Sequence, residues 1–257
     1  MLNKRYFIRS SAGIFFILFS LQLESEEFTY KFQWLSLPVA SLSIEFDDIA
    51  YDNNDIGSRT TNFKLTTKGP LRLYREYNSQ GYIKYDADIS WDYYLSGNDR
   101  GQPEEKHITY FYNMAPKIRK FIDDIGVSPI NIDSRLDKNA IDPFSVLFRT
   151  IDQLKSEQQC KNEFIIMDGK RRYKIIVNLE EKIVDLDKEM NEAQNIIYFC
   201  KFTFSYLREE KRKWPFNKKN RYLDVWFSSK LGYKPTRFYT KTPIGSIVGD
   251  YVIDRQR

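Results

Sequence analysis

The chain has 257 residues, of which 42% are hydrophobic and 16% aromatic, and it carries a formal net charge of +5. This aromatic content argues against a disordered or low-complexity protein. The charge excess is mild and no basic stripe accompanies it, which argues against a nucleic-acid-binding protein. The length suits one large domain.

The first 25 residues have the layout of a secretory signal, with basic residues near the start followed by an uncharged apolar run over 12–21. That run is short for a membrane-spanning helix. The sequence therefore predicts a Sec-type signal peptide at 1–25, a periplasmic location and a mature domain at 26–257. The alternative is an uncleaved segment that anchors the protein in the inner membrane, facing the periplasm.

Apolar and polar side chains alternate with a period of two along most of the mature chain. The pattern is clearest at 28–34 and 40–46. It returns in shorter form at 63–65, 173–177, 202–206, 223–227 and 251–253. Successive side chains of a strand point to opposite faces, so each stretch predicts a strand with one buried face. We expect a mainly β fold, an antiparallel sheet of about nine to eleven strands.

One segment has helical spacing instead. Asp142 and Pro143 are typical of a helix start, as a capping residue followed by proline at the first helical position. Apolar residues then recur every three or four positions, at Phe144, Leu147, Phe148, Ile151 and Leu154. This spacing predicts one principal helix, over 143–158, packed on the sheet. The stretch 116–126 fits both a helix and a bent strand, and the strand is favoured.

Two cysteines, Cys160 and Cys200, lie in the mature part. A lone pair in an oxidising compartment predicts one disulfide, and the alternative is two buried free thiols. Closing this loop of about 40 residues would stabilise the fold by roughly 4 kcal/mol.

Several short segments carry a family resemblance. In chain order they are 34–40 (WLSLPVA), 66–71 (TTKGPL), 142–145 (DPFS), Cys160, 167–173 (MDGKRRY), Cys200 and 234–237 (KPTR). Together they resemble the bacterial exported proteins of domain of unknown function 3108. The chain departs from that pattern at Ser36 and Ala40, where family members often have glycine.

The resemblance implies a fold but no activity. More distantly, this family is similar to the half-barrel of periplasmic lipoprotein carriers. In that fold a curved antiparallel sheet wraps an apolar cavity that helices cover. In such a half-barrel the helix at 143–158 would be a lid or a plug. The strand pattern by itself does not distinguish this fold from a closed barrel or a sandwich.

The residue types argue against catalysis and against a metal or cofactor site. His107 is the one histidine of the chain, and no cysteine or carboxylate lies at metal-ligand spacing beside it. No nucleophile, base and acid can be assembled into a catalytic set. Asp168 and Gly169 favour a hairpin turn of type I′. We therefore expect a protein that is not an enzyme and has no cofactor.

Two groups of residues are binding candidates. Aromatic residues of the strands and the helix are candidate walls of an apolar ligand cavity: Phe32, Trp34, Phe144, Phe148, Phe202, Phe204 and Phe227. Basic residues of a long loop are candidate contacts to an anionic membrane surface: Lys211, Arg212, Lys213, Lys218 and Lys219.

The leading hypothesis is an exported, non-enzymatic, monomeric protein that binds a lipid, a lipoprotein acyl chain or an envelope partner. The alternative is an outer-membrane β-barrel or a structural envelope protein. Lysine and arginine interrupt most of the strands, and these side chains are costly where they face lipid, which disfavours the alternative.

Overall fold

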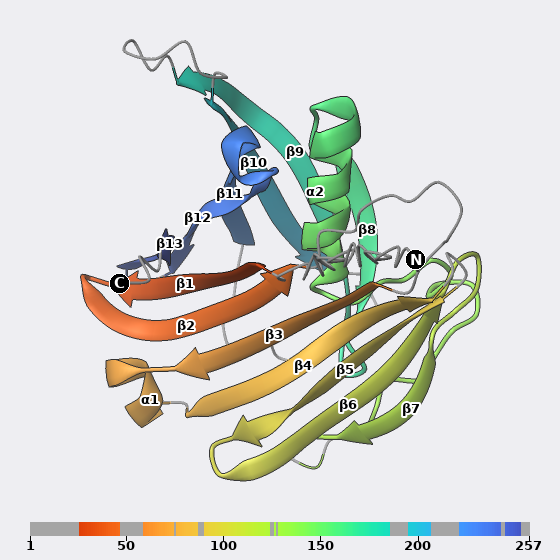
Figure 1. The fold of residues 1–257 in the computed structure, drawn as a ribbon. Helices are drawn as coiled ribbons and strands as arrows, with labels where there is room; N and C mark the ends of the chain where they lie inside the picture. The colour runs from red at the N-terminus through yellow and green to blue at the C-terminus, as the bar shows by residue number, and fades with distance from the viewer. Residues whose placement is uncertain are drawn as a thin grey trace, which may run out of the picture.

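The fold is one antiparallel sheet that curls around a helix (Figure 1). The predicted signal peptide and the predicted basic loop at 208–221 lie outside the described part of the chain, except that Arg221 begins a strand. The computed structural model describes residues 26–46, 59–74, 76–86, 90–123, 126, 128–185, 195–206, 221–242 and 245–252.

The described residues contain thirteen strands and three helical segments. The strands are β1 (Glu26–Trp34), β2 (Leu37–Phe46), β3 (Arg59–Thr67), β4 (Tyr77–Asp86), β5 (Ser90–Asp99), β6 (Gln102–Phe111), β7 (Lys117–Ile122), β8 (Asn162–Met167), β9 (Arg172–Asp185), β10 (Asn195–Tyr206), β11 (Arg221–Ser228), β12 (Lys234–Thr242) and β13 (Gly245–Val252). The helical segments are α1 (Gly69–Tyr74), α2 (Ser145–Glu157) and the short 3-10 turn η1 (Ser229–Leu231).

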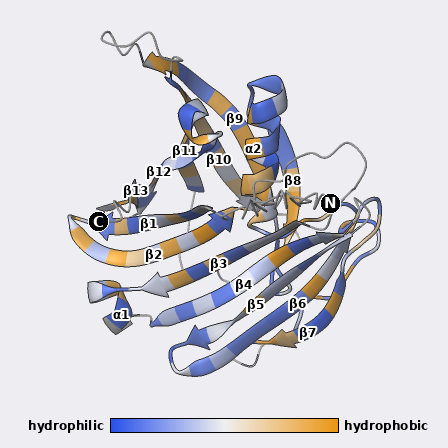
Figure 2. Cartoon of the chain, viewed as in Figure 1, coloured by the Kyte–Doolittle hydropathy of each residue, from blue (hydrophilic) through white to orange (hydrophobic). Residues whose placement is uncertain are grey.

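The strand order is β7-β6-β5-β4-β3-β2-β1-β13-β12-β11-β10-β9-β8. Strand β1 pairs with β2 on one side and with β13 on the other, which joins an N-terminal half to a C-terminal half. Strands β7 and β8 stand at the two ends of this order, so the sheet is open. The predicted antiparallel half-barrel is confirmed, and alternating hydropathy follows its strands (Figure 2).

The sheet has two strands more than the upper number expected from the alternation. The favoured strand at 116–126 is confirmed as β7. Strands β4, β5 and β6 form a long meander whose apolar pattern is weak in the sequence. The reason is that several inward-facing positions of this meander are occupied by polar residues or glycines.

Helix α2 begins two residues later than predicted and lies on the concave side of the sheet (Figure 1). Its buried face includes Phe148, Ile151 and Leu154, which belong to the predicted stripe. Phe144, just before the helix, stacks on Phe63 of β3 at 4.1 Å between ring centroids, and Phe148 meets Phe46 of β2 at 5.7 Å. The helix therefore packs against the N-terminal half of the sheet on its concave side.

The hairpin between β8 and β9 brings the two ends of the sheet together. The hydroxyl of Tyr110 on β6 donates to the carbonyl of Met167 at 2.5 Å, and Lys170 Nζ lies 2.8 Å from Asp123 Oδ1. Gly169 has a φ of +82° and lies so close to Phe121 that a Cβ would come within 2.9 Å of the ring. Glycine is thus required both by backbone conformation and by space.

This hairpin corrects the predicted turn type. A type I′ turn needs positive φ at both central residues, whereas only Gly169 has positive φ in the connection from Asp168 to Arg171. Met167 pairs with Arg172, so four residues join the strands. The Asp168 carboxylate accepts the backbone N–H groups of Lys170 and Arg171, which stabilises this longer turn.

The predicted disulfide between Cys160 and Cys200 is confirmed, and both residues are fully buried. Cys160 follows α2 and Cys200 lies on β10, so the bond ties the end of the helix to the C-terminal half. Among the described residues, no helix combines the length and the apolar character needed to cross a membrane.

Candidate functional site

The concave face of β3 to β6 is built from rows of side chains that the strand register places side by side. One row contains Ile83, Tyr93 and Ile108, and the next contains Trp91 and Tyr110. These side chains are buried. Together with the N-terminal end of α2 they make this part of the interior apolar.

Asp142 anchors the start of α2 to this apolar wall. Its Oδ1 accepts the backbone N–H groups of Phe144 at 2.9 Å and Ser145 at 2.8 Å. The predicted cap position is corrected, because the N-cap of α2 is Phe144 and Pro143 precedes the helix, so Asp142 binds the helix start from two positions before the cap. Its Oδ2 accepts Trp91 Nε1–H at 2.9 Å and also the Ser145 hydroxyl. Burial raises the pKa of Asp142, and these hydrogen bonds oppose that rise.

Beyond the N-terminal end of α2 the same concave face becomes polar. Ser79, Glu104 and Lys106 are buried there on β4 and β6, and Lys106 Nζ lies 2.8 Å from Glu104 Oε1. Burial raises the pKa of the neighbouring Tyr77 most, and the Glu104 charge raises it further. The Tyr77 hydroxyl lies within hydrogen-bonding reach of the Ser79 and Glu104 side chains, although Glu104 Oε2 and Ser79 Oγ have no hydrogen bond of good geometry among the described residues. These four residues lie in three neighbouring rows of the register, and we call them together the inner polar row.

Glycines flank the inner polar row on the same face. Gly97 lies between Ser79 and Glu104 in the register, and Gly81 lies next to Phe63. A Cβ at Gly81 would come within 2.6 Å of the Phe63 ring. The ring that stacks on Phe144 therefore lies over Gly81, at the border between the apolar rows and the polar row.

The structure distributes the seven candidate cavity residues over the interior. Phe148, Phe202 and Phe227 are buried, whereas Phe32, Trp34, Phe144 and Phe204 are partly buried. The two phenylalanines of the α2 segment face β2 and β3. Phe202 and Phe227 contact each other across β10 and β11, at 6.4 Å between centroids, and Phe32 packs against Phe238 of β12. The six phenylalanines belong to one continuous core or pack against it, whereas Trp34 is outside that core. The seven residues therefore do not line one pocket. The basic residues 211–213, 218 and 219 lie outside the described part.

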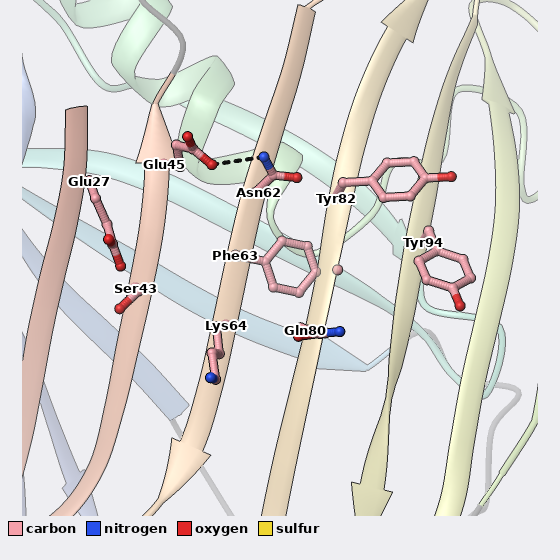
Figure 3. A pocket seen from close by; sticks show the side chains of 10 residues that line it. Glu27, Ser43, Glu45, Asn62, Phe63, Lys64, Gln80, Tyr82 and Tyr94 are labelled. Carbon is pink, nitrogen blue, oxygen red and sulfur yellow. Dashed lines mark hydrogen bonds between the residues drawn. The ribbon is translucent and has the colours of Figure 1, made fainter. Parts of the chain in front are cut away.

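The described residues also form a hollow of about 400 Å³ on the opposite, outer face of the sheet (Figure 3). Its walls come from strands β1 to β5. We call it the outer hollow, and it is lined by Glu27, Ser43, Glu45, Asn62, Phe63, Lys64, Gln80, Gly81, Tyr82 and Tyr94. None of the seven aromatic candidates lines it.

Comparison with protein families decides the identity of the chain. The family model described as "Protein of unknown function (DUF3108)" matches residues 28–252. The chain belongs to the DUF3108 family. No curated protein matches the sequence.

A solved structure shares the fold of this DUF3108 protein. It is a beta-barrel-like protein of domain of unknown function DUF1849 from Brucella abortus, with a TM-score of 0.55. The match covers 88% of this chain and 94% of that chain at 12% sequence identity. At this identity the likeness shows the fold alone, and it agrees with the half-barrel architecture.

The remaining sequence candidates of the DUF3108 protein lie apart from the interior. His107 lies on the outer face of β6, with Nε2 3.5 Å from Asp92 Oδ1. In the described part of the chain, no three histidine, cysteine or carboxylate side chains are grouped so that they could hold a metal ion. Sequence reasoning missed both the inner polar row and the outer hollow, because their residues come together only through the strand register.

Proposed function

We propose that this DUF3108 protein is an exported periplasmic protein without enzymatic activity, and that it binds an amphiphile in the half-barrel. The apolar part of the ligand, an acyl chain of a lipid or lipoprotein, would lie between α2 and strands β2 to β5. The observation that carries the proposal is the change from apolar rows to the inner polar row along one concave face, at the end of α2.

The contacts between α2 and the N-terminal half suit exchange with an acyl chain. Phe144 meets Phe63 and Phe148 meets Phe46 through ring contacts, so a chain that inserts there replaces one apolar contact with another. Little apolar area then becomes exposed to water, and the hydrogen bonds that join Asp142 to Trp91 and Ser145 to Tyr85 hold the start of α2 in place. The disulfide from Cys160 to Cys200 keeps the far end of α2 attached to β10 meanwhile.

The inner polar row supports a ligand with a polar head. Glu104 Oε2 and Ser79 Oγ are buried polar atoms beside the Tyr77 hydroxyl, and a buried polar atom whose hydrogen bonds have poor geometry costs free energy. A head group that donates hydrogen bonds, a hydroxyl or an amine, would satisfy both atoms. Lys106 beside them suits an oxygen-bearing head group as well.

Replacing Phe144 with alanine is expected to strengthen the binding of a fluorescent fatty-acid analogue to the purified domain. The variant weakens the closed state, so a larger fraction of molecules is competent to bind and the apparent Kd falls, by roughly tenfold for each 1.4 kcal/mol lost by the closed state. The measurement is a fluorescence titration without detergent.

The matched control is Phe199→Ala. Phe199 is also partly buried and also stacks, on Trp226 at 4.7 Å, but it lies on the outer face of the sheet. This variant should bind the analogue as the wild type does. Equal affinities for the wild type and Phe144→Ala, or the same gain for Phe199→Ala, would contradict binding under α2.

A further inference from the structure

The outer hollow has the mixed hydrogen-bonding chemistry that hydroxyl-rich ligands need. Glu27 and Glu45 only accept hydrogen bonds when ionised, and Lys64 only donates them. The amides of Asn62 and Gln80 do both. A sugar hydroxyl also donates and accepts, so neighbouring hydroxyls of one ring can each find a matching group here.

Two aromatic rings form one side of the outer hollow. Tyr82 and Tyr94 stack on each other, with centroids 5.2 Å apart and an interplanar angle of 23°. Figure 3 shows both at the same end of the hollow, beyond Asn62 and Gln80. The faces of aromatic rings are negative, and they attract the polarised C–H groups on the flat side of a pyranose ring.

The strand register holds these groups in fixed positions. Glu45 pairs with Asn62, Asn62 with Tyr82, and Tyr82 with Tyr94, so the four side chains form one row across β2 to β5. Asn62 Nδ2 donates to Glu45 Oε2 at 2.8 Å, which orients both polar groups before any ligand arrives. A site on paired strands is more precisely preorganised than one on loops.

The charges of the outer hollow select among ligands. The lining holds two carboxylates and one ammonium group, so it carries a net negative charge that disfavours phosphate and other anions. Lys64 would in turn repel a divalent cation. Neutral ligands pay no such penalty, and a ligand with an amino group would gain from Glu27 and Glu45.

We propose that the outer hollow binds a neutral or amino-bearing saccharide, with a pyranose ring against Tyr82 and Tyr94 and its hydroxyls on Asn62, Gln80 and Glu45. This site is separate from the amphiphile site, since it lies on the other face of the sheet. It gives an exported protein a means to attach to a glycan while its interior remains available.

The test is isothermal titration of the detergent-free protein with chitotetraose, with the fully deacetylated tetramer and with an anionic oligogalacturonate. The neutral and the amino-bearing tetramers should bind saturably and the anionic one should not. Tyr82→Ala should weaken binding by at least roughly tenfold, about 1.4 kcal/mol. Glu45→Gln should weaken the binding of the amino-bearing tetramer more than the binding of the neutral one.

Tyr239→Ala is the matched control, because Tyr239 is a partly buried tyrosine on the outer face of the C-terminal half, beside Ser246 at 3.0 Å. It should bind both tetramers as the wild type does. The proposal is overturned if neither tetramer binds saturably, or if Tyr82→Ala and Glu45→Gln both bind as tightly as Tyr239→Ala. Uptake of the fatty-acid analogue should be the same in Tyr82→Ala and wild type.

Discussion

Replacing Arg172 with methionine is expected to lower the free energy of unfolding by about 3 to 5 kcal/mol, because the change leaves a buried carboxylate without its partner. Arg172 donates to Asp137 through both Nε and Nη2, the second contact at 2.6 Å, and Asp137 is fully buried. The same guanidinium reaches the carbonyl of Asn131 at 3.2 Å. Urea unfolding followed by circular dichroism measures the effect.

An exposed ion pair provides the control. Arg237 Nε lies 2.6 Å from Asp250, with both side chains about half exposed, so Arg237→Met should cost about 1 kcal/mol or less. The double change Arg172→Met with Asp137→Leu should recover much of the lost stability, since no charge then remains buried. Equal losses for Arg172→Met and Arg237→Met would show that the buried pair does not hold the segment before α2.

Removing the disulfide is expected to cost about 4 kcal/mol in the chain-entropy model, since 40 positions separate Cys160 from Cys200. The double variant Cys160→Ala with Cys200→Ala should unfold at a lower urea concentration than the wild type. A reducing agent should lower the wild-type midpoint and leave the double variant unchanged. The bond also ties the end of α2 to β10. The double variant should therefore discriminate less between the fatty-acid analogue and other apolar ligands.

A wild-type midpoint that stays the same under complete reduction would contradict this account. Thiol titration under denaturing conditions establishes that reduction is complete.

Local patterns in the sequence were sufficient for much of the fold. Alternation over 28–34 predicted β1, the spacing after Asp142 predicted α2, and the cysteine pair predicted the disulfide. Each of these signals is local or depends on residue type alone. The half-barrel itself came from the family resemblance, because alternation does not report how a sheet curves.

The binding surfaces needed the register as well. Ser79 and Glu104 are separated by 25 positions and become neighbours only because both pair around Gly97. In the sequence they look like solvent-facing residues, since serine and glutamate are usually exposed. The outer hollow likewise draws on β1 to β5, and a one-residue shift of any strand would turn its side chains to the other face.

Native mass spectrometry of the domain, purified from the periplasm without detergent, tests the central claim most directly. The account predicts a bound amphiphile that is lost on denaturation and is more abundant in Phe144→Ala than in the wild type. A head group with hydroxyl or amino donors is expected, and Glu104→Gln should lower its occupancy. Clean apo masses for both the wild type and Phe144→Ala would contradict amphiphile binding and would direct the search to a protein partner in the envelope.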